Sequence, residues 1–502
     1  MSDIFSESEK ISTTHTYAAL DLGSNSFHLL VAYDKPGRLH VVDKHREMVR
    51  LAEGLHESNE LSLAVIKRAI KCLERIGQRL RGVPSENIRV VGTNTLRTAS
   101  NSQHFIELAE SALGHRIEVI SGREEARLIY LGVSHSLEDR LASRLVIDVG
   151  GGSTELILGR QFQPKIMESL HMGCVSMSNR FFRDGKIRSV NFDRAIDAAR
   201  QEVEVIQQVF TAHGWDVAIG ASGTLLSIHS VLTEVIGEEN ITLEGLDKLR
   251  RLLIDSHQTA NIELPGINKG RAQVFPGGVA IVLAIMEELG VGSIVVSNGA
   301  LREGLLHDLL GRVHAEDIRE KSVDDLVSRF HIDLNHALRV AGTASDFFSQ
   351  VSSQWQIDNT DNRNLLRWAA MLHEIGMDIS HSSYQKHGGY LLEHMDLPGF
   401  SLYEQKRLAT LVRSHRRKYN AEEIEEDLLA NKLCAILRLA VVLHRSRSMQ
   451  PLPSFAVNVD DKMLDVTIPL KWLEAHPLTK LDLQQEHEFL SAAPIGLSIN
   501  KN

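Results

Sequence analysis

The sequence lacks the features that place a protein outside the cytoplasm or within a membrane. Its three cysteines, Cys72, Cys174 and Cys434, are far apart and odd in number, so they form neither a disulfide framework nor a Cys-X-X-Cys metal pair. The polar N-terminal stretch differs from a signal peptide, and no apolar stretch approaches the roughly 20 residues of a membrane span. We therefore expect a cytoplasmic protein without a transmembrane segment.

An excess of basic residues is also missing, since the net charge is −10. This acidic balance argues against a nucleic-acid partner, which would need a basic surface. An anionic substrate would have to be bound locally, by metal ions, backbone amides and a confined basic patch. The 502 residues exceed the length of one compact core and predict three or four domains.

The first part of the chain has an internal repeat. Strand and helix signals alternate from residue 16 to about residue 311, which is typical of an α/β fold. Within this part, LDLGSNSFHLLVA from Leu20 has the same layout as IDVGGGSTELILG from Ile147. The aspartates of the two segments, Asp21 and Asp148, lie about one domain length apart. The repeat favours two homologous lobes, each with a glycine-rich hairpin.

The pattern changes after about residue 316. Helical signals with many histidines and arginines continue to Arg447, and Phe455–Val459 and Leu464–Ile468 then alternate apolar and polar residues like a β-hairpin. We expect a first lobe over residues 16–128, a second lobe over 129–311, a helical domain over 316–447 and a small α+β domain over 448–502.

The two repeated loops have the composition of a phosphate site. A glycine two residues after each aspartate permits a tight turn that brings backbone N–H groups close to a ligand. Clustered N–H groups bind anions, and Asp21 and Asp148 can hold a divalent cation against a phosphate. One such loop alone would be an ordinary turn, but two matched loops favour a site. The predicted substrate-binding residues are Gly23, Ser24, Asn25, Ser26, Gly150, Gly151, Gly152 and Ser153, with Gly223 of a third loop, GASGT.

Three further residues are candidates for the chemistry. Glu155 follows the second loop on an apolar strand, where we expect it to bind a metal ion or a water molecule. Ser121 and Glu124 have capping-box spacing, which assigns Glu124 a structural role and leaves Glu125 as a candidate general base at a helix N-terminus. Arg97 follows a strand and can clamp phosphate oxygens, although a solvated arginine is an equal interpretation of that segment alone.

Taken together, the motifs resemble those of the exopolyphosphatase and guanosine pentaphosphate phosphatase family. The matches run nearly end to end and include DLGSNSFHLLVA, GTNTLRTAS, VISGREEARLIYLGV, LVIDVGGGSTELILG, SNGALREGLL and LHEIG. The resemblance implies two actin-like (ribonuclease H-like) lobes, a helical HD-like domain and a small C-terminal domain, in a homodimer. It also implies that Glu125 is the general base and that Asp148 and Glu155 associate with Mg²⁺.

The helical region departs from the wider HD pattern. Metal-dependent HD domains use an adjacent His-Asp pair, but here the pair is His373-Glu374. Because glutamate is one methylene longer, we expect a degenerate, metal-free HD fold. The basic run from Arg413 to Arg447 suggests a patch that attracts a polyanion. Neighbouring histidines could resemble a metal cluster: His381, His387, His394 and His415.

The function expected from these features is Mg²⁺-dependent hydrolysis that releases terminal phosphate from inorganic polyphosphate. Guanosine pentaphosphate is the alternative substrate. GGGST and SHRRK favour polyphosphate, whereas RFHIDLNHALRVA and WLEAHPL look closer to the pentaphosphatase branch. Two other classes stay open. A sugar-kinase-like, ATP-dependent enzyme would need an adenosine pocket, and an inactive HD-type scaffold would hydrolyse neither substrate.

Overall fold

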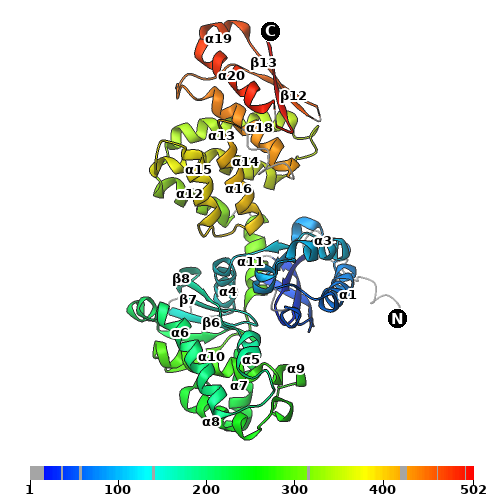
Figure 1. The fold of residues 1–502 in the computed structure, drawn as a ribbon, viewed down its shortest axis with the longest axis vertical. Helices are drawn as coiled ribbons and strands as arrows, with labels where there is room; N and C mark the ends of the chain where they lie inside the picture. The colour runs from blue at the N-terminus through cyan, green and yellow to red at the C-terminus, as the bar shows by residue number, and fades with distance from the viewer. Residues whose placement is uncertain are drawn as a thin grey trace, which may run out of the picture. The chain divides into compact units, whose positions relative to one another are not determined.

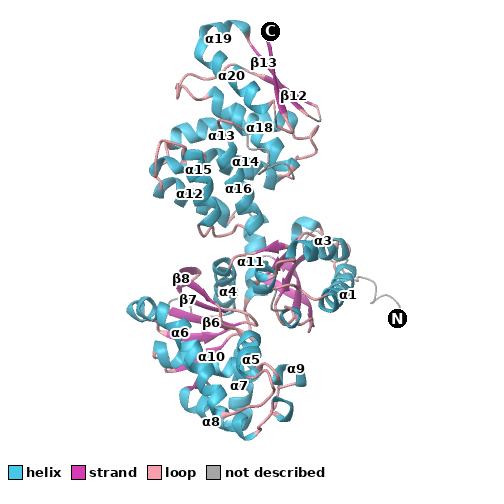
Figure 2. Cartoon of the chain, in the orientation of Figure 1, coloured by secondary structure: helices cyan, strands magenta, loops and turns pink. Residues whose placement is uncertain are grey.

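The fold is that of a computed structural model, which describes residues 16–35, 38–55, 59–137, 142–313, 317–418, 427–460, 462–491 and 493–501. The chain divides into two compact units on either side of the bond between Asp317 and Ile318. Each unit has buried cores of its own, and Figure 1 shows the course of the chain through its helices and strands. Figure 2 shows the strands confined to the first unit and to the C-terminal end of the second.

The first sheet has five strands in the order β3-β2-β1-β4-β5. Its central strand β1 runs antiparallel to β2 and parallel to β4. Helices α1 (Leu63–Arg79) and α3 (Ser102–Leu113) bury their apolar stripes against one face of this sheet. The strands are β1 (Thr16–Leu22), β2 (Phe27–Lys35), β3 (Arg38–Glu47), β4 (Ile88–Gly92) and β5 (Glu118–Val119), and the short helix α2 (Asn94–Thr98) follows β4.

The second sheet has six strands in the order β10-β11-β9-β6-β7-β8. One face carries a helical layer whose central member, α10 (Phe275–Leu289), is buried on all sides from Phe275 to Met286 and packs against α5, α6 and α8. The strands are β6 (Ser143–Val149), β7 (Thr154–Arg160), β8 (Gln163–Leu170), β9 (Val217–Gly220), β10 (Ile241–Thr242) and β11 (Ser293–Val296). The other helices are α5 (Cys174–Phe181), α6 (Ser189–His213), α7 (Gly223–Val231), α8 (Leu243–Asp255) and α9 (Lys269–Ala272).

The internal repeat is visible in the register of the two hairpins. In the first hairpin Asp21 of β1 lies opposite His28 of β2, and in the second Asp148 of β6 lies opposite Glu155 of β7. The two aspartates therefore hold equivalent positions at the ends of equivalent strands.

Two helices lie between the sheets. These are α4 (Gly122–Ser136) and α11 (Leu301–Val313), which pack against each other, and α11 also contacts β1, β2 and β4. Leu128 and Leu305 of these helices share one buried cluster with Leu30 of the first sheet and Ile157 of the second. The expected lobe boundary at residue 128 falls inside α4, and the expected domain limits stay predictions.

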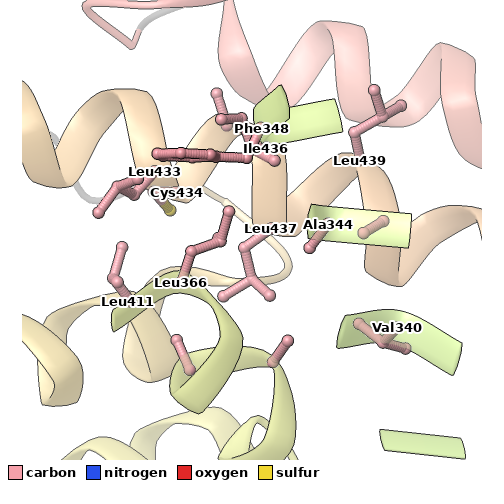
Figure 3. Close-up of a cluster of buried hydrophobic side chains, with 14 of the residues drawn as sticks. Val340, Ala344, Phe348, Leu366, Leu411, Leu433, Cys434, Ile436, Leu437 and Leu439 are labelled. Carbon is pink, nitrogen blue, oxygen red and sulfur yellow. The ribbon is translucent and has the colours of Figure 1, made fainter. Parts of the chain in front are cut away.

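The second unit begins with a helical array and ends with a small sheet, as the sequence predicted. The expected hairpin corresponds to β12 and β13, and β14, which pairs in parallel with β13, was not predicted. One buried cluster continues from the helices into this sheet; Figure 3 shows its part around Phe348, Leu366 and Leu437. The elements are α12 (Ile318–Arg329), α13 (Leu334–Val351), α14 (Thr360–Leu372), α15 (Tyr384–His394), α16 (Leu402–Ser414), α18 (Leu428–Leu443), β12 (Ala456–Val459), β13 (Met463–Ile468), α19 (Leu470–Ala475), α20 (Pro477–Leu490) and β14 (Gly496–Lys501).

The described residues bear on two expectations, which concern disulfides and membrane spans. Cys72, Cys174 and Cys434 are buried free thiols, so they form no disulfide with one another. Within the described ranges, no helix combines the length and the apolar character needed to cross a bilayer.

Candidate active site

Four predicted carboxylates gather in the first unit. Asp21 and Asp148 end equivalent strands, Glu155 begins the strand paired with β6, and Glu125 lies in the first turn of α4. Glu125, Asp148 and Glu155 are buried. Asp21 Oδ1 is also buried and has no hydrogen-bond partner among the described residues. A concentration of buried negative charge with an orphaned oxygen has the chemistry of a site for a hard cation such as Mg²⁺.

The electrostatics of this cluster show how closely its members interact. The pKa of Asp21 is raised to about 8, mainly by burial and then by the negative charge of Glu125, while Arg302 lowers it and Asp148 adds a smaller increase. Burial, followed by the charge of Glu125, raises the pKa of Asp148 to about 7. The pKa of Glu155 is raised by burial first and then by the negative charges of Glu125 and Asp148. The cluster therefore favours bound protons or a cation over four free charges.

The two predicted phosphate loops face each other. A Cβ atom added to Gly151 would lie 2.9 Å from the Cβ of Ser24, and one added to Gly152 would lie 2.3 Å from Asn94 Oδ1. Thr95 of α2 donates a hydrogen bond to Ser24 Oγ at 2.7 Å. The second loop therefore needs glycines because the first loop and α2 approach its backbone closely.

Arg97 is bound to the predicted general base. Its Nη1 donates to Glu125 Oε2 at 2.8 Å and to the carbonyl oxygen of Ile120 at 2.9 Å. The sequence predicted both side chains but not their ion pair. Because Arg97 fixes one carboxylate oxygen of Glu125, the other oxygen has a defined direction.

Glu124 has a larger structural role than the expected cap. The Ser121 hydroxyl accepts from the Glu124 N–H at 3.1 Å, as the capping pattern predicted. The carboxylate of Glu124, however, accepts two hydrogen bonds from Arg127, each 2.8 Å long. Arg127 and Arg89 also both bind Asp308 of α11. We call these four side chains the interhelix ion network, which adds to the structural role that the capping pattern predicted for Glu124.

Glu155 is held by a neighbouring strand. Ser169 of β8 donates to Glu155 Oε1 at 2.8 Å. The equivalent position in the first hairpin is His28, whose Nε2 lies 2.6 Å from Ser26 Oγ. The site therefore differs between the two lobes, with a carboxylate on one side and an imidazole on the other.

The third loop joins the end of β6. Ser222 Oγ accepts from the N–H of Val149 at 3.3 Å, and Thr224 donates to the Val149 carbonyl oxygen at 2.9 Å. A Cβ atom on Gly223 would lie 2.7 Å from Arg271 Nη2. Gly223 thus leaves room for a guanidinium beside the loop.

The sequence interpretation missed a group of basic side chains near the first loop. The pKa of His28 is lowered most by burial and then by the positive charges of Arg302, Arg46 and Arg271. Arg302 Nη1 also lies 3.3 Å from His28 Nδ1. Arg302 belongs to the SNGALREGLL segment, so that motif was the available signal. We call Arg46, Arg271 and Arg302 the loop arginines.

Part of the predicted basic patch of the helical domain is engaged in ion pairs. Arg438 is fully buried and binds Glu486. Other arginines of the run also have acidic partners, since Arg413 binds Glu393 and Arg447 binds both Glu374 and Asp333. The expectation of a patch from Arg413 to Arg447 was wrong for these residues, because a count of basic letters does not show their internal ion pairs.

Comparisons with known proteins agree with this fold. Residues 30–313 match the Ppx/GppA phosphatase family, and residues 318–487 match domain III of the Ppx/GppA phosphatases. A guanosine-5'-triphosphate,3'-diphosphate pyrophosphatase from Aeromonas hydrophila is 40% identical over 477 residues, which cover 94% of this chain and 96% of that protein.

Solved structures resemble the chain over a shorter span. An exopolyphosphatase from Cytophaga hutchinsonii has a TM-score of 0.55 at 22% identity, covering 59% of this chain and 97% of its own. An exopolyphosphatase-like protein has a TM-score of 0.54 at 25% identity, and the match covers 59% of this chain and 99% of that protein's chain. Fold and matches together define a phosphoanhydride hydrolase with two actin-like lobes and a following helical domain. The chain belongs to the Ppx/GppA phosphatase family, which confirms the resemblance and the fold class that the motifs indicated.

Proposed function

We propose that this phosphatase releases the terminal phosphate of guanosine-5'-triphosphate,3'-diphosphate, with water as the acceptor. The observation that carries the reaction is the cluster of Asp21, Glu125, Asp148 and Glu155 next to two glycine-rich loops that approach each other closely. Water attack on a phosphoanhydride requires a base, charge neutralisation and positioning of the phosphoryl group.

Each residue has a distinct role in this proposal. The N–H groups of the two loops bind the oxygens of the terminal phosphates, and Glu125, oriented by Arg97, accepts the proton of the attacking water. Asp148 and Glu155, with Asp21 opposite, would hold Mg²⁺. When bound, this ion would supply positive charge to the transferring phosphoryl group. The orphaned oxygen of Asp21 supports this fit.

The choice of nucleotide rests on two observations. The relative that is 40% identical over nearly the whole chain is named for this substrate. In addition, a pocket beside the first loop is lined by Ser24 and Asn25 and extends to Asn179, Phe182 and Arg183. A guanosine moiety needs such a space beyond the phosphates, whereas an inorganic chain does not.

Inorganic polyphosphate is the second candidate. The loop arginines (Arg46, Arg271 and Arg302) form a local basic group that suits any linear polyanion. The argument from SHRRK is weaker than expected, because His415 is buried in that stretch and Arg416 lies over the ring of Tyr384.

The deciding experiment compares kcat/KM for guanosine pentaphosphate and for long polyphosphate at equal Mg²⁺. We expect the nucleotide to be preferred at least tenfold, which is a difference of about 1.4 kcal/mol in transition-state binding. Glu125→Gln serves as the control for contaminating phosphatase. Equal or inverted preference would favour polyphosphate, and hydrolysis of neither would favour the inactive-scaffold class. We also propose a cytoplasmic homodimer, which light scattering and fractionation can test.

A further inference from the structure

The helical unit contains a cluster of buried histidines that the proposed reaction does not use. His336 lies in the first turn of α13, and His373 and Glu374 follow α14. All three are buried. One ligand atom from each lies within 4.8 Å of the others, which makes this the single such group of three or more found in the described part of the chain.

The distances suit a small cation. Glu374 Oε1 lies 3.9 Å from His336 Nε2 and 4.0 Å from His373 Nε2. Two donors bound to one tetrahedral zinc ion at about 2.1 Å are about 3.4 Å apart. Shortening the two carboxylate-to-imidazole distances by about half an ångström, and bringing the two imidazole nitrogens together from within 4.8 Å, would place these atoms in one first coordination sphere.

The hydrogen bonds fix which nitrogen of His373 can bind a metal. Its Nδ1 lies 2.7 Å from the carbonyl oxygen of Ala370, so Nδ1 carries the proton and donates. Its Nε2 then presents a lone pair, and this atom is buried without a hydrogen-bond partner among the described residues. Metal-binding histidines typically donate their second ring N–H to a backbone carbonyl in this way.

His415 repeats the arrangement next to His373. Its Nδ1 lies 2.6 Å from the carbonyl oxygen of Val412, and its Nε2 is likewise buried without a partner in the described chain. The rings of His373 and His415 are 5.3 Å apart. Two neighbouring imidazoles that each present a buried, unpaired lone pair favour a cation over an anion.

We propose that His336, His373 and Glu374 form a binding site for a divalent transition-metal ion of the Zn²⁺ or Co²⁺ class. Two imidazoles and one carboxylate are borderline ligands that select such ions over Mg²⁺. Three protein ligands leave at least one coordination position for water or for an oxygen of an anionic ligand. This proposal departs from the expectation of a metal-free domain, because that expectation considered the His373-Glu374 pair without His336 of the preceding helix.

Arg447 competes with the ion for Glu374. Arg447 Nη2 donates to Glu374 Oε1, and its Nη1 donates to Asp333 Oδ2 at 3.1 Å. Asp333 can keep Arg447 when Glu374 turns to the metal, but the guanidinium charge opposes a cation. Removing that charge therefore strengthens metal binding.

The test uses the full chain, freed of metal with a chelator and titrated with Co²⁺ in a large excess of Mg²⁺. We expect one saturable Co²⁺ per chain with the visible absorption of imidazole coordination, and one Zn²⁺ by mass spectrometry. His373→Gln and Glu374→Gln weaken binding by roughly 100-fold or more. Arg447→Gln strengthens it by roughly tenfold.

The matched control is His381→Gln, which changes an exposed histidine of the same unit and leaves binding unchanged. Circular dichroism of each variant separates lost ligands from lost folding, and the wild-type stoichiometry does not depend on any variant. The proposal is overturned if the wild-type chain binds no Co²⁺ under these conditions. It is also overturned if folded His373→Gln keeps the wild-type affinity.

Discussion

The adjacent residues Glu124 and Glu125 of α4 allow a direct test of which glutamate stabilises the fold and which takes part in hydrolysis. Glu124 binds Arg127 inside the interhelix ion network, whereas Glu125 binds Arg97 next to Asp21 and Asp148. We compare Glu124→Gln with Glu125→Gln, because the two substitutions remove the same charge one residue apart.

The two variants should differ in stability by an amount set by burial. The side chain of Glu124 is 1% exposed and that of Arg127 is 9% exposed. Removing one partner of a buried ion pair costs about 3–5 kcal/mol. For a unit of roughly 300 residues this lowers the Tm by about 5–8 °C. Glu125→Gln keeps an amide oxygen for Arg97 and relieves repulsion from Asp148, so stability should change by less than about 1 kcal/mol.

The activities should change in the opposite order. Glu125→Gln should lower kcat by roughly 10²–10⁴, the usual contribution of a positioned general base. Folded Glu124→Gln, assayed well below its Tm, should keep most of the wild-type kcat. Arg123→Gln is the control, because the Arg123–Glu168 pair is exposed and contributes less than about 1 kcal/mol.

The assay measures phosphate release on guanosine pentaphosphate together with thermal and urea unfolding of all three variants. A Glu124→Gln protein of wild-type stability and negligible activity, beside an active Glu125→Gln protein, would refute both assignments.

Three further predictions concern the same site. Asp21 and Asp148 have pKa values raised to about 8 and about 7, so the folded protein holds more protons than the unfolded chain between about pH 4 and 8. Stability without Mg²⁺ should therefore fall as pH rises through this window, and Mg²⁺ should stabilise more at pH 8 than at pH 6 in urea unfolding; equal effects would contradict a shared site. Asp148→Asn or Glu155→Gln should raise the Mg²⁺ concentration for half-maximal activity at least tenfold, and full activity in EDTA would exclude the metal-assisted mechanism. Asn179→Trp, which fills the pocket beside the first loop, should lower kcat/KM roughly tenfold for the nucleotide and leave that for polyphosphate unchanged.

Local sequence patterns were sufficient for helix α1 and for the repeat. Ser62 caps α1, and Gly82 adopts a φ of +89° beyond the end of that helix, so the stretch from Leu63 to Leu80 could be read from capping and periodicity. The matched loops placed Asp21 and Asp148 at equivalent strand ends, since equal sequence layouts give equal hairpins.

Contacts between distant segments could not be predicted in this way. Asp308 follows Arg89 by more than two hundred residues, and no periodicity links them. The same limit hid the buried pair of Arg438 with Glu486 and the approach of His336 to Glu374. Charge, burial and partner identity are properties of the folded chain, so a single sequence shows the charged residue without its partner.

The position of α11 has a consequence for synthesis. The first sheet ends at Val119, but Asp308, which binds Arg89 of that sheet, lies beyond the last strand of the second sheet, which ends at Val296. A ribosome that adds about 5–20 residues per second needs about 10–40 s to cover this interval. During that time the nascent first lobe has an uncovered apolar face, and Arg89 can pair with Glu118 but not with Asp308. We therefore expect protease resistance of the first lobe to arise only after α11 has left the ribosome.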